Sequence, residues 1–550
     1  IYAEGFFEVL HADAQVEESG TYIPPRVEGR FTLRGVDFTT TARCAVVLPA
    51  GSTLVLADGT ENFLASGDFV TEETGEKDSE YTYVYGLYTA GDLTVRGGGS
   101  LTVRAGDFRN TGKTPESVGL YVGGDLTMWS GNLTAMGGEA RFVEANTDGW
   151  AFSVGVEVTG GDVLIAGGCL HGIAAKAVAA DAYGDMSSFS RGVCTLNADV
   201  TVSGDGKLYG EVMEEACVNS LQVGVYVSGG KLSAYNTAEV VGEGTTGVDV
   251  TGEILLDGGA LRGIGGGEYG GYGIDLEGTG AGYAKKWSGN FTVSGGALSA
   301  VRGVHMYAPD GTNKAVFRMT GGTGTIDKLY GAQQLLLEGG SLTVGSDAVP
   351  GSVGATAVSI TGGSLEIVAE AWTASGSFPR GFALTCATLA VSGGTLSARY
   401  AVTEERSELP VRLALVQAQQ SADFTGGTAL FDAGVGNTAV LSMVYRYSED
   451  GAAYTDGIIR MQGDAMHLTG SREALPDGGA VRLTQKYQDS PVTFSDVVRQ
   501  TVTVTLAALD KRYDGSTDCT LTGILAGADA GDRLFLGTAD ATAQFDTPDV

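Results

Sequence analysis

The stretch GLYTAGDLTVRGGGSLTV, residues 86–103, decides the fold. It reads as short strands with apolar residues at alternate positions, such as Leu93 and Val95, joined by glycine-rich corners. Glycine reaches positive φ without a Cβ clash, so Gly-Gly pairs suit such corners. Because one such unit cannot bury its apolar face alone, it must stack on copies of itself.

The copies are present. The pattern returns as GLYVGGDLTMWSGNLTAMGG from Gly119, GVEVTGGDVLIAGGCLHG from Gly155, GVYVSGGKLSA from Gly224 and GVDVTGEILLDGGALRG from Gly247. The leading glycines lie at 86, 119, 155, 192, 224, 247, 273, 303, 331, 354 and 381, at a mean interval of about 30 residues. A period of this length indicates a solenoid or a propeller. Strands of about four residues, corner loops of variable length and no helical periodicity favour an all-β chain, a right-handed parallel β-helix of about 11–12 coils.

Four segments follow from this pattern. We expect an N-terminal cap and first coils over 1–85, the β-helix repeats over 86–427, a C-terminal cap and linker over 428–500, and a small β module over 501–550. The chain begins without Met and stops within a strand-like pattern, so we expect it to be a piece of a longer protein.

Composition narrows the classes of partner. The chain has 550 residues, with 34 Lys+Arg against 66 Asp+Glu, a formal net charge of −32. Hydrophobic residues make up 43%, which is enough for a core and argues against disorder. The negative charge argues against nucleic acid and anionic membranes as partners. No apolar run reaches the ~18 residues of a membrane helix, and we expect no membrane insertion and a monomer.

Cysteine and histidine give no catalytic or metal signature. The six cysteines include no C-x-x-C, so we expect free thiols, although a disulfide such as Cys169–Cys194 stays open. None of the four histidines lies in a nucleophile motif, so we expect solvated or hydrogen-bonded side chains at His11, His171, His305 and His467.

The alternation also predicts which side chains face outward. The residue after each leading glycine is apolar and should point inward: Leu87, Leu120, Val156, Val193, Val225, Val248, Ile274 and Val304. The next residue should then point to solvent: Tyr88, Tyr121, Glu157, Cys194, Tyr226, Asp249, Asp275 and His305. Tyrosine rings stack on sugar rings, and carboxylates accept hydroxyl hydrogen bonds or hold a cation. All of these except Cys194 are our candidate polysaccharide-binding residues, but the same column also fits an ordinary strand surface.

Two acidic features allow several interpretations. Asp249 and Asp275 lie one coil apart, so their carboxyl groups should be about 5 Å apart. One pKa could rise, the pair could hold a cation, or both could be solvated acids. The stretch GGYGIDLEG from Gly270 departs from the calcium-binding nonapeptide at Glu277 and occurs once.

The segment AGSTLVLADGTENFLASGD, followed by GLYTAGDLTVRGGGSLTV, resembles secreted bacterial carbohydrate-binding domain-containing proteins with a pectate-lyase-like β-helix. The resemblance covers about residues 27–470. It implies a secreted or cell-surface location and binding of plant polysaccharides such as cellulose or pectin, with calcium. Members with calcium sites carry Asp before the leading glycine. The sequence departs from that pattern, with Tyr85, Val118, Val154, Arg191, Val223, Thr246, Tyr272 and Arg302 at this position.

The tail LDKRYDG, residues 509–515, with LTGILAGADAGD after it, resembles the start of a YDG domain of bacterial surface adhesins. Three functions follow as hypotheses. The first is a non-catalytic surface protein that binds polysaccharide, and the second is a stalk or adhesin scaffold that binds no glycan. The third is a polysaccharide lyase or hydrolase; Asp-Asp and Gly-His-Gly motifs are absent, so we expect no enzyme and no catalytic residues.

Overall fold

The chain is described here by a computed structural model. It describes residues 29–71, 81–110, 114–143, 150–179, 188–213, 220–266, 271–278, 289–308, 315–370, 382–401 and 414–432, with short strands at 2–3, 5–6 and between 439 and 526. The regular secondary structure of these residues consists of strands alone, which agrees with the all-β class expected from sequence. No helix in this part of the chain is long and apolar enough to span a membrane.

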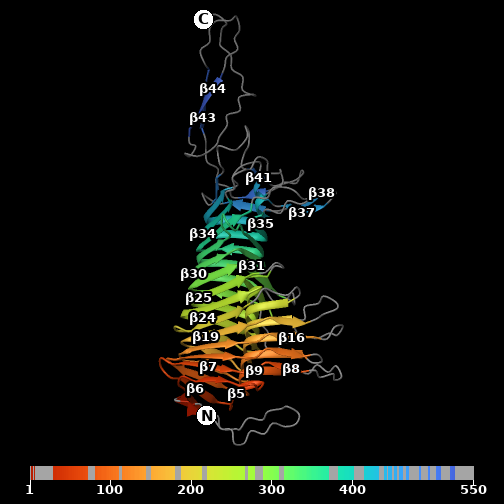
Figure 1. Ribbon diagram of the computed structural model, residues 1–550. Coiled ribbons are helices and arrows are strands. Elements are labelled where there is room, and N and C mark those ends of the chain that lie inside the picture. The colour runs from red at the N-terminus through yellow and green to blue at the C-terminus, as the bar shows by residue number, and fades with distance from the viewer. Residues whose placement is uncertain are drawn as a thin grey trace, which may run out of the picture.

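Three ladders of parallel strands make up an elongated body, along which the chain runs from one end to the other (Figure 1). Each repeat adds one strand, or one part of a longer strand, to each ladder. The first ladder contains the leading glycines and runs through β5 (Cys44–Leu48), β9 (Tyr81–Thr89), β13 (Thr114–Val122), β17 (Ala151–Thr159), β21 (Ser188–Leu196), β24 (Ser220–Gly244), β25 (Thr246–Gly265), β26 (Ile274–Glu277), β29 (Val304–Tyr307), β31 (Lys328–Val344), β32 (Ser352–Ile360), β34 (Leu384–Tyr400), β35 (Ala414–Asp432), β36 (Ala439–Ser442) and β41 (Arg482–Thr484).

The other two ladders use the remaining parts of the long strands together with shorter strands. The second adds β3 (Arg30–Leu33), β6 (Ser52–Leu56), β10 (Leu93–Gly97), β14 (Leu126–Met128), β18 (Val163–Ile165), β22 (Val200–Val202), β27 (Phe291–Val293), β30 (Val316–Ile326), β39 (Ile458–Met461) and β42 (Thr493–Ser495). The third shares β30 and adds β4 (Asp37–Thr39), β7 (Glu61–Ala65), β11 (Ser100–Arg104), β15 (Asn132–Met136), β19 (Cys169–Ala174), β23 (Lys207–Val212), β28 (Ala297–Val301), β33 (Ser364–Ala369) and β40 (Met466–Thr469). The ladders therefore include strands on both sides of the expected repeat region 86–427.

One hydrophobic core lies between the ladders and extends from Leu33 to Ala429. The inward prediction is confirmed, because all eight residues that follow leading glycines from Leu87 to Val304 are at most 1% exposed. Gly-Gly pairs turn the corners as predicted; the second glycine of two such pairs, Gly340 and Gly363, has φ of 75° and 67°.

At another corner, a series of aspartates connects each repeat to the next by hydrogen bonds. The Asp125 N–H donates to Asp92 Oδ1 at 2.9 Å, and the Asp162 N–H donates to Asp125 Oδ1 at 2.8 Å. The series continues from the Asp199 N–H to Asp162 Oδ1 at 2.9 Å. Each carboxylate thus satisfies a backbone donor of the following repeat, where the ladder leaves that donor unpaired.

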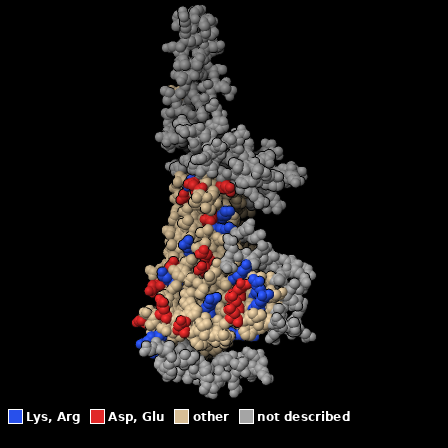
Figure 2. Space-filling model, in the orientation of Figure 1, with Lys and Arg blue, Asp and Glu red and all other residues tan. Residues whose placement is uncertain are grey.

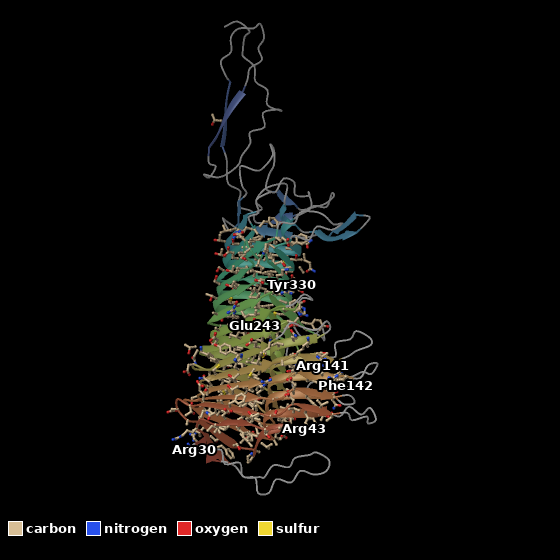
Figure 3. All side chains as sticks on the ribbon, viewed as in Figure 1. Arg30, Arg43, Arg141, Phe142, Glu243 and Tyr330 are labelled. Carbon is tan, nitrogen blue, oxygen red and sulfur yellow. The ribbon has the colours of Figure 1, made fainter. Side chains whose placement is uncertain are left out.

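A lateral wing extends from the body and was not predicted from sequence. Its sheet contains β8 (Phe69–Thr71), β12 (Phe108–Asn110), β16 (Ala140–Phe142) and β20 (Ala177–Ala179), all parallel. This sheet packs against the first halves of β9, β13, β17 and β21, where Phe108 meets Val84 and Phe142 lies in one cluster with Ala151. Figure 1 shows β8 and β16 to one side of the body, and Figure 3 places Arg141 and Phe142 on that wing.

The remaining strands form antiparallel pairs: β1 (Tyr2–Ala3) with β2 (Gly5–Phe6), β37 (Val444–Ser448) with β38 (Gly451–Tyr454), and β43 (Thr503–Ala508) with β44 (Leu521–Ala526). The last pair lies in the segment expected to be a separate β module. The rest of that module falls outside the described residues.

Candidate binding site at the outer corner

The candidate residues share one register column. Tyr88 pairs with Tyr121, Tyr121 with Glu157, and the pairing continues through Cys194, Tyr226, Asp249 and Asp275 to His305. We call this set the outer column. Seven ladder steps of about 4.8 Å separate Tyr88 from His305, so the column is about 34 Å long.

The expectation that the whole column faces solvent is wrong. Glu157 is 8% exposed and Cys194 is 1% exposed. Tyr88, Tyr121, Tyr226, Asp249, Asp275 and His305 are half-buried. The cause is a second set of side chains, the residues just before the leading glycines, which lie on the same outer side. We call these the flank column: Tyr85, Val118, Val154, Arg191, Val223, Thr246 and Tyr272.

The leading glycines bring the two columns together. A Cβ on Gly119 would lie 2.6 Å from the Gly155 carbonyl oxygen and 2.5 Å from the Met136 nitrogen. Gly155 and Gly192 meet the backbone of their neighbours equally closely. These glycines are therefore required by close backbone approach rather than by positive φ. On either side of them, strand residues point into different cores: Val84 into the wing and Leu87 into the body. The outer and flank columns consequently meet at an outer corner.

Tyrosines line one end of this corner. The Tyr88 and Tyr121 rings stack with centroids 5.1 Å apart, and the Tyr85 ring lies 5.0 Å from Tyr88 and 5.5 Å from Tyr121. Tyr83 stacks on Tyr85 at 5.4 Å. The hydroxyls of Tyr121 and Thr159 are 2.8 Å apart and hydrogen-bonded. Burial raises the pKa of Tyr85, Tyr88 and Tyr121, so these phenols stay neutral near pH 7.

Two buried carboxyl groups follow along the corner. Glu116, on the wing side of Val118, hydrogen-bonds to Glu157 of the outer column. Loss of hydration raises the pKa of both, and the negative charge of Glu157 raises the pKa of Glu116 further. The pair is therefore expected to share one proton. Glu157 Oε2 is buried and has no hydrogen-bond partner among the described residues.

The positive charge of Arg191 lowers the pKa of both acids and so partly offsets the effect of burial. Its guanidinium carbon is 4.2 Å from the Tyr226 ring centroid and 5.3 Å from that of Phe189, in cation–π geometry. Its Nη1 donates to Cys194 Sγ at 3.6 Å, while its buried Nε lacks a partner within the described residues. The corner thus holds both a buried acceptor and a buried donor whose hydrogen-bonding capacity is unused.

The far end of the outer column is more polar. Asp249 and Asp275 are register partners, and desolvation together with the charge of Asp275 raises the pKa of Asp249 to about 7. One of the stated alternatives, a raised pKa for one acid of the pair, is thus supported. Asp275 Oδ1 lies 2.8 Å from His305 Nδ1, and the Tyr272 ring stacks on His305 at 4.5 Å. The histidines were expected to be solvated or hydrogen-bonded, and this is confirmed for His305 and for His171, which hydrogen-bonds to Glu211. The side chains of His11 and His467 lie outside the described residues.

Several residues of the corner were missed. Tyr83, Glu116 and Arg191 belong to the wing half of each strand, and simple alternation across the glycine assigns Arg191 to the wrong side. Tyr330 extends the column beyond His305 (Figure 3). It was missed because Gly331, Gly354 and Gly381 are not the equivalents of the earlier leading glycines. In the later repeats, the strand register places Lys328, Ser352 and Ala383 at the position that the leading glycines occupy earlier. These residues come directly before Leu329, Val353 and Leu384.

The cysteines and the acidic groups supply no metal site in the described residues. Cys44, Cys169, Cys194 and Cys386 are free thiols, so a Cys169–Cys194 disulfide is absent; Cys217 and Cys519 lie outside the described residues. Burial raises the pKa of Cys44, Cys194 and Cys386 to about 12, which makes these thiols unreactive. Figure 2 shows acidic and basic side chains interspersed over the face in view.

No protein-family model, curated protein or solved structure matches this chain, so both family resemblances stay expectations.

Proposed function

We propose that the three ladders form a right-handed parallel β-helix and that its outer corner binds a polysaccharide chain. The first ladder alone has 15 strands among the described residues, so the solenoid is longer than the 11–12 coils expected from sequence. The observation that carries the proposal is the outer column itself. It aligns tyrosine rings and carboxyl groups in register over successive ladder steps, and the guanidinium of Arg191, from the flank column, lies against Tyr226. A polymer of sugar rings can occupy such a row by repeating one type of contact.

The chemistry of the corner suits sugar rings. Neutral tyrosines offer flat faces for the apolar side of a pyranose and hydroxyls for hydrogen bonds. The half-buried carboxyl groups of Asp249 and Asp275 can accept hydrogen bonds from sugar hydroxyls, directly or through water.

The charge of the corner favours a neutral glycan. Glu116, Glu157, Asp249 and Asp275 outnumber Arg191, and the whole chain carries a net charge of −32. A polyuronate such as pectate would be repelled unless cations screened it. Of the polysaccharides that the resemblance implies, cellulose-type chains therefore fit better than pectin. A secreted or cell-surface location and a monomeric state remain parts of this proposal.

Binding of the chain to neutral and acidic polysaccharides tests the proposal, with calcium in one arm and chelator in the other. We expect neutral glycans to bind in both arms, and Tyr88→Ala or Tyr121→Ala to weaken binding about tenfold. Tyr209→Ala is the matched control, because Tyr209 lies on β23 of the third ladder. Absence of binding to all glycans would favour a structural stalk or adhesin scaffold instead.

A further inference from the structure

Three aromatic rings gather on the wing half of the strands that form the outer corner. Phe152 on β17 and Phe189 on β21 are register neighbours, and their rings stack with centroids 4.9 Å apart and planes at 10°. The Trp150 ring stands across both, with centroids at 6.3 Å and 6.4 Å and planes at 77° and 76°. Trp150 is 49% exposed, and the two phenylalanines are half-buried. We call these three residues the wing platform.

The wing platform lies on the face of its strands that points away from the wing sheet. Ala151 and Ser188 directly precede the two phenylalanines and are buried, and Ala151 packs in one cluster with Phe142 of the wing sheet. Successive side chains of a strand point to opposite faces, so Phe152 and Phe189 point outward. Large aromatic rings that reach solvent together are typical of binding surfaces.

Arg191 connects the wing platform to the outer column. Its guanidinium carbon lies 5.3 Å from the Phe189 ring centroid, 5.9 Å from that of Phe152 and 4.2 Å from that of Tyr226. Phe152 also packs against the same buried cluster as Tyr121 and Tyr226 of the outer column. The corner therefore has aromatic rings on two walls, with tyrosines on the body wall and the wing platform on the other.

One linear chain along the outer column cannot cover both walls. Phe152 and Glu157 of the outer column are five positions apart on β17, which is up to about 17 Å of extended strand. A glycan stacked on the tyrosines therefore needs a side branch to reach the Trp150 ring.

The chemistry of the wing platform favours a neutral branch. Phenyl and indole faces pack on the apolar faces of sugar rings, and the indole N–H can donate to a sugar hydroxyl. The acids of the corner outnumber Arg191, so a branch that carries a carboxylate would be repelled.

We propose that the wing platform is a second subsite of the outer corner. It binds neutral side sugars of a branched polysaccharide, whose cellulose-type main chain lies along the outer column. This inference rests on the proposed binding function and narrows its ligand from neutral glycans in general to branched ones.

A matched pair of oligosaccharides tests the inference by isothermal titration calorimetry. Cellotetraose supplies the main chain alone, and the xyloglucan oligosaccharide with the same tetraose backbone adds neutral xylose branches. We expect wild type to bind the branched ligand about tenfold more tightly. Trp150→Ala should abolish that difference and leave the affinity for cellotetraose unchanged. Trp150→Phe, which keeps an aromatic ring, should retain part of the difference.

Two further variants control for position. Trp129 is 56% exposed between β14 of the second ladder and β15 of the third, whereas the wing platform lies on strands of the first. Trp129→Ala should therefore bind both ligands as wild type does. Tyr121→Ala should weaken both ligands to a similar extent, because it acts on the main chain.

The possible outcomes separate the branch subsite from the binding function. Equal affinity of wild type for the linear and branched ligands overturns the branch subsite and leaves the binding function intact. Equal losses for both ligands in Trp150→Ala also overturn it, since the platform would then hold the main chain. A wild-type dimer that Trp150→Ala dissociates in sedimentation equilibrium would assign the platform to a second copy of the chain and overturn the inference. Failure to bind either ligand or any neutral polysaccharide removes the proposed function itself.

Discussion

At the residue scale, the corner is a place where acids are kept partly uncharged by their surroundings. Burial raises the pKa of Glu116 and Glu157, and burial beside Asp275 raises the pKa of Asp249. Folding therefore makes these carboxyls bind protons more tightly than in the unfolded chain. Their effect on stability runs opposite to that of a salt-bridged aspartate.

Replacing Asp249 by Asn should change how stability depends on pH. The pKa of Asp249 rises from 3.8 to about 7 on folding, so the folded state holds the extra proton between these values. Wild-type stability should fall as pH rises from about 4 to 7 and then level off. Asp249→Asn should remove about 2–3 kcal/mol of that fall. Urea unfolding at pH 4.5 and 8 measures it; a variant that keeps the full wild-type slope contradicts the cause assigned here.

The buried thiols give a second residue-scale prediction. Cys194 and Cys386 are at most 2% exposed, and their raised pKa keeps them as thiols. Maleimide labelling of these two positions should be negligible in the native chain and complete in urea. Mass mapping of the labelled peptides measures each site. Rapid native labelling of Cys194 would mean that the wing opens away from the body.

The outer column could be predicted from sequence because it needs only strand alternation and a recurring glycine. The corner could not, because Arg191 and Glu116 reach it from the wing half of each strand. That half reverses its orientation at the glycine bend, and alternation counted from Leu87 assigns Tyr85 and Arg191 inward. The pairing of Asp249 with Asp275, 26 positions apart in sequence, was predicted, because it follows from the same column register.

At the element scale, two backbone devices hold each repeat to the next. Leading glycines allow the strands to bend against neighbouring backbone, and aspartates fasten the corner that follows. The strands themselves were predictable from apolar alternation. The wing was not, since β8, β12, β16 and β20 have only three residues each and show little periodicity.

Gly119→Ala tests the first device. The new methyl group would lie 2.5–2.6 Å from backbone atoms of Met136 and Gly155, so a strand must shift. We expect the urea midpoint to fall by the equivalent of about 3 kcal/mol. Gly354→Ala is the matched control, because its nearest contact would be 3.8 Å away. Equal effects of the two changes would refute close approach as the reason for the leading glycine.

Asp125→Ala tests the second device. It removes the acceptor of the Asp162 N–H, a charge-assisted bond of 2.8 Å on an exposed corner. Loss of about 1 kcal/mol locally should speed hydrogen exchange at the Asp162 amide about fivefold. Exchange of the Asp199 amide, which uses Asp162 instead, should change less. Uniform acceleration along the whole ladder would indicate global destabilisation rather than the loss of one bond.

At the scale of the whole molecule, a net charge of −32 acts on a long body in which each repeat touches mainly its neighbours. Self-repulsion along such a body should weaken it at low salt. Added salt should therefore raise the melting temperature through screening.

Calcium distinguishes screening from specific binding. The described residues offer no group of three metal-ligating side chains, so CaCl₂, MgCl₂ and NaCl at equal ionic strength should stabilise the chain to similar extents. Differential scanning fluorimetry over a salt series measures this. A rise of several degrees with calcium alone, at micromolar concentration, would instead show a calcium site and revive that part of the family resemblance.

The leading glycines have one more consequence. They fix the path of the backbone without help from the outer-column residue two positions later in the chain. That residue already varies among the repeats, from tyrosine to cysteine to aspartate. At the half-buried positions, such as Tyr88, Tyr226 and Asp249, the side chain is therefore not fixed by the backbone path, whereas Glu157 and Cys194 are buried. One such side chain can be exchanged while the spacing of the strands stays the same. Ligand preference could be rewritten position by position on an unchanged frame.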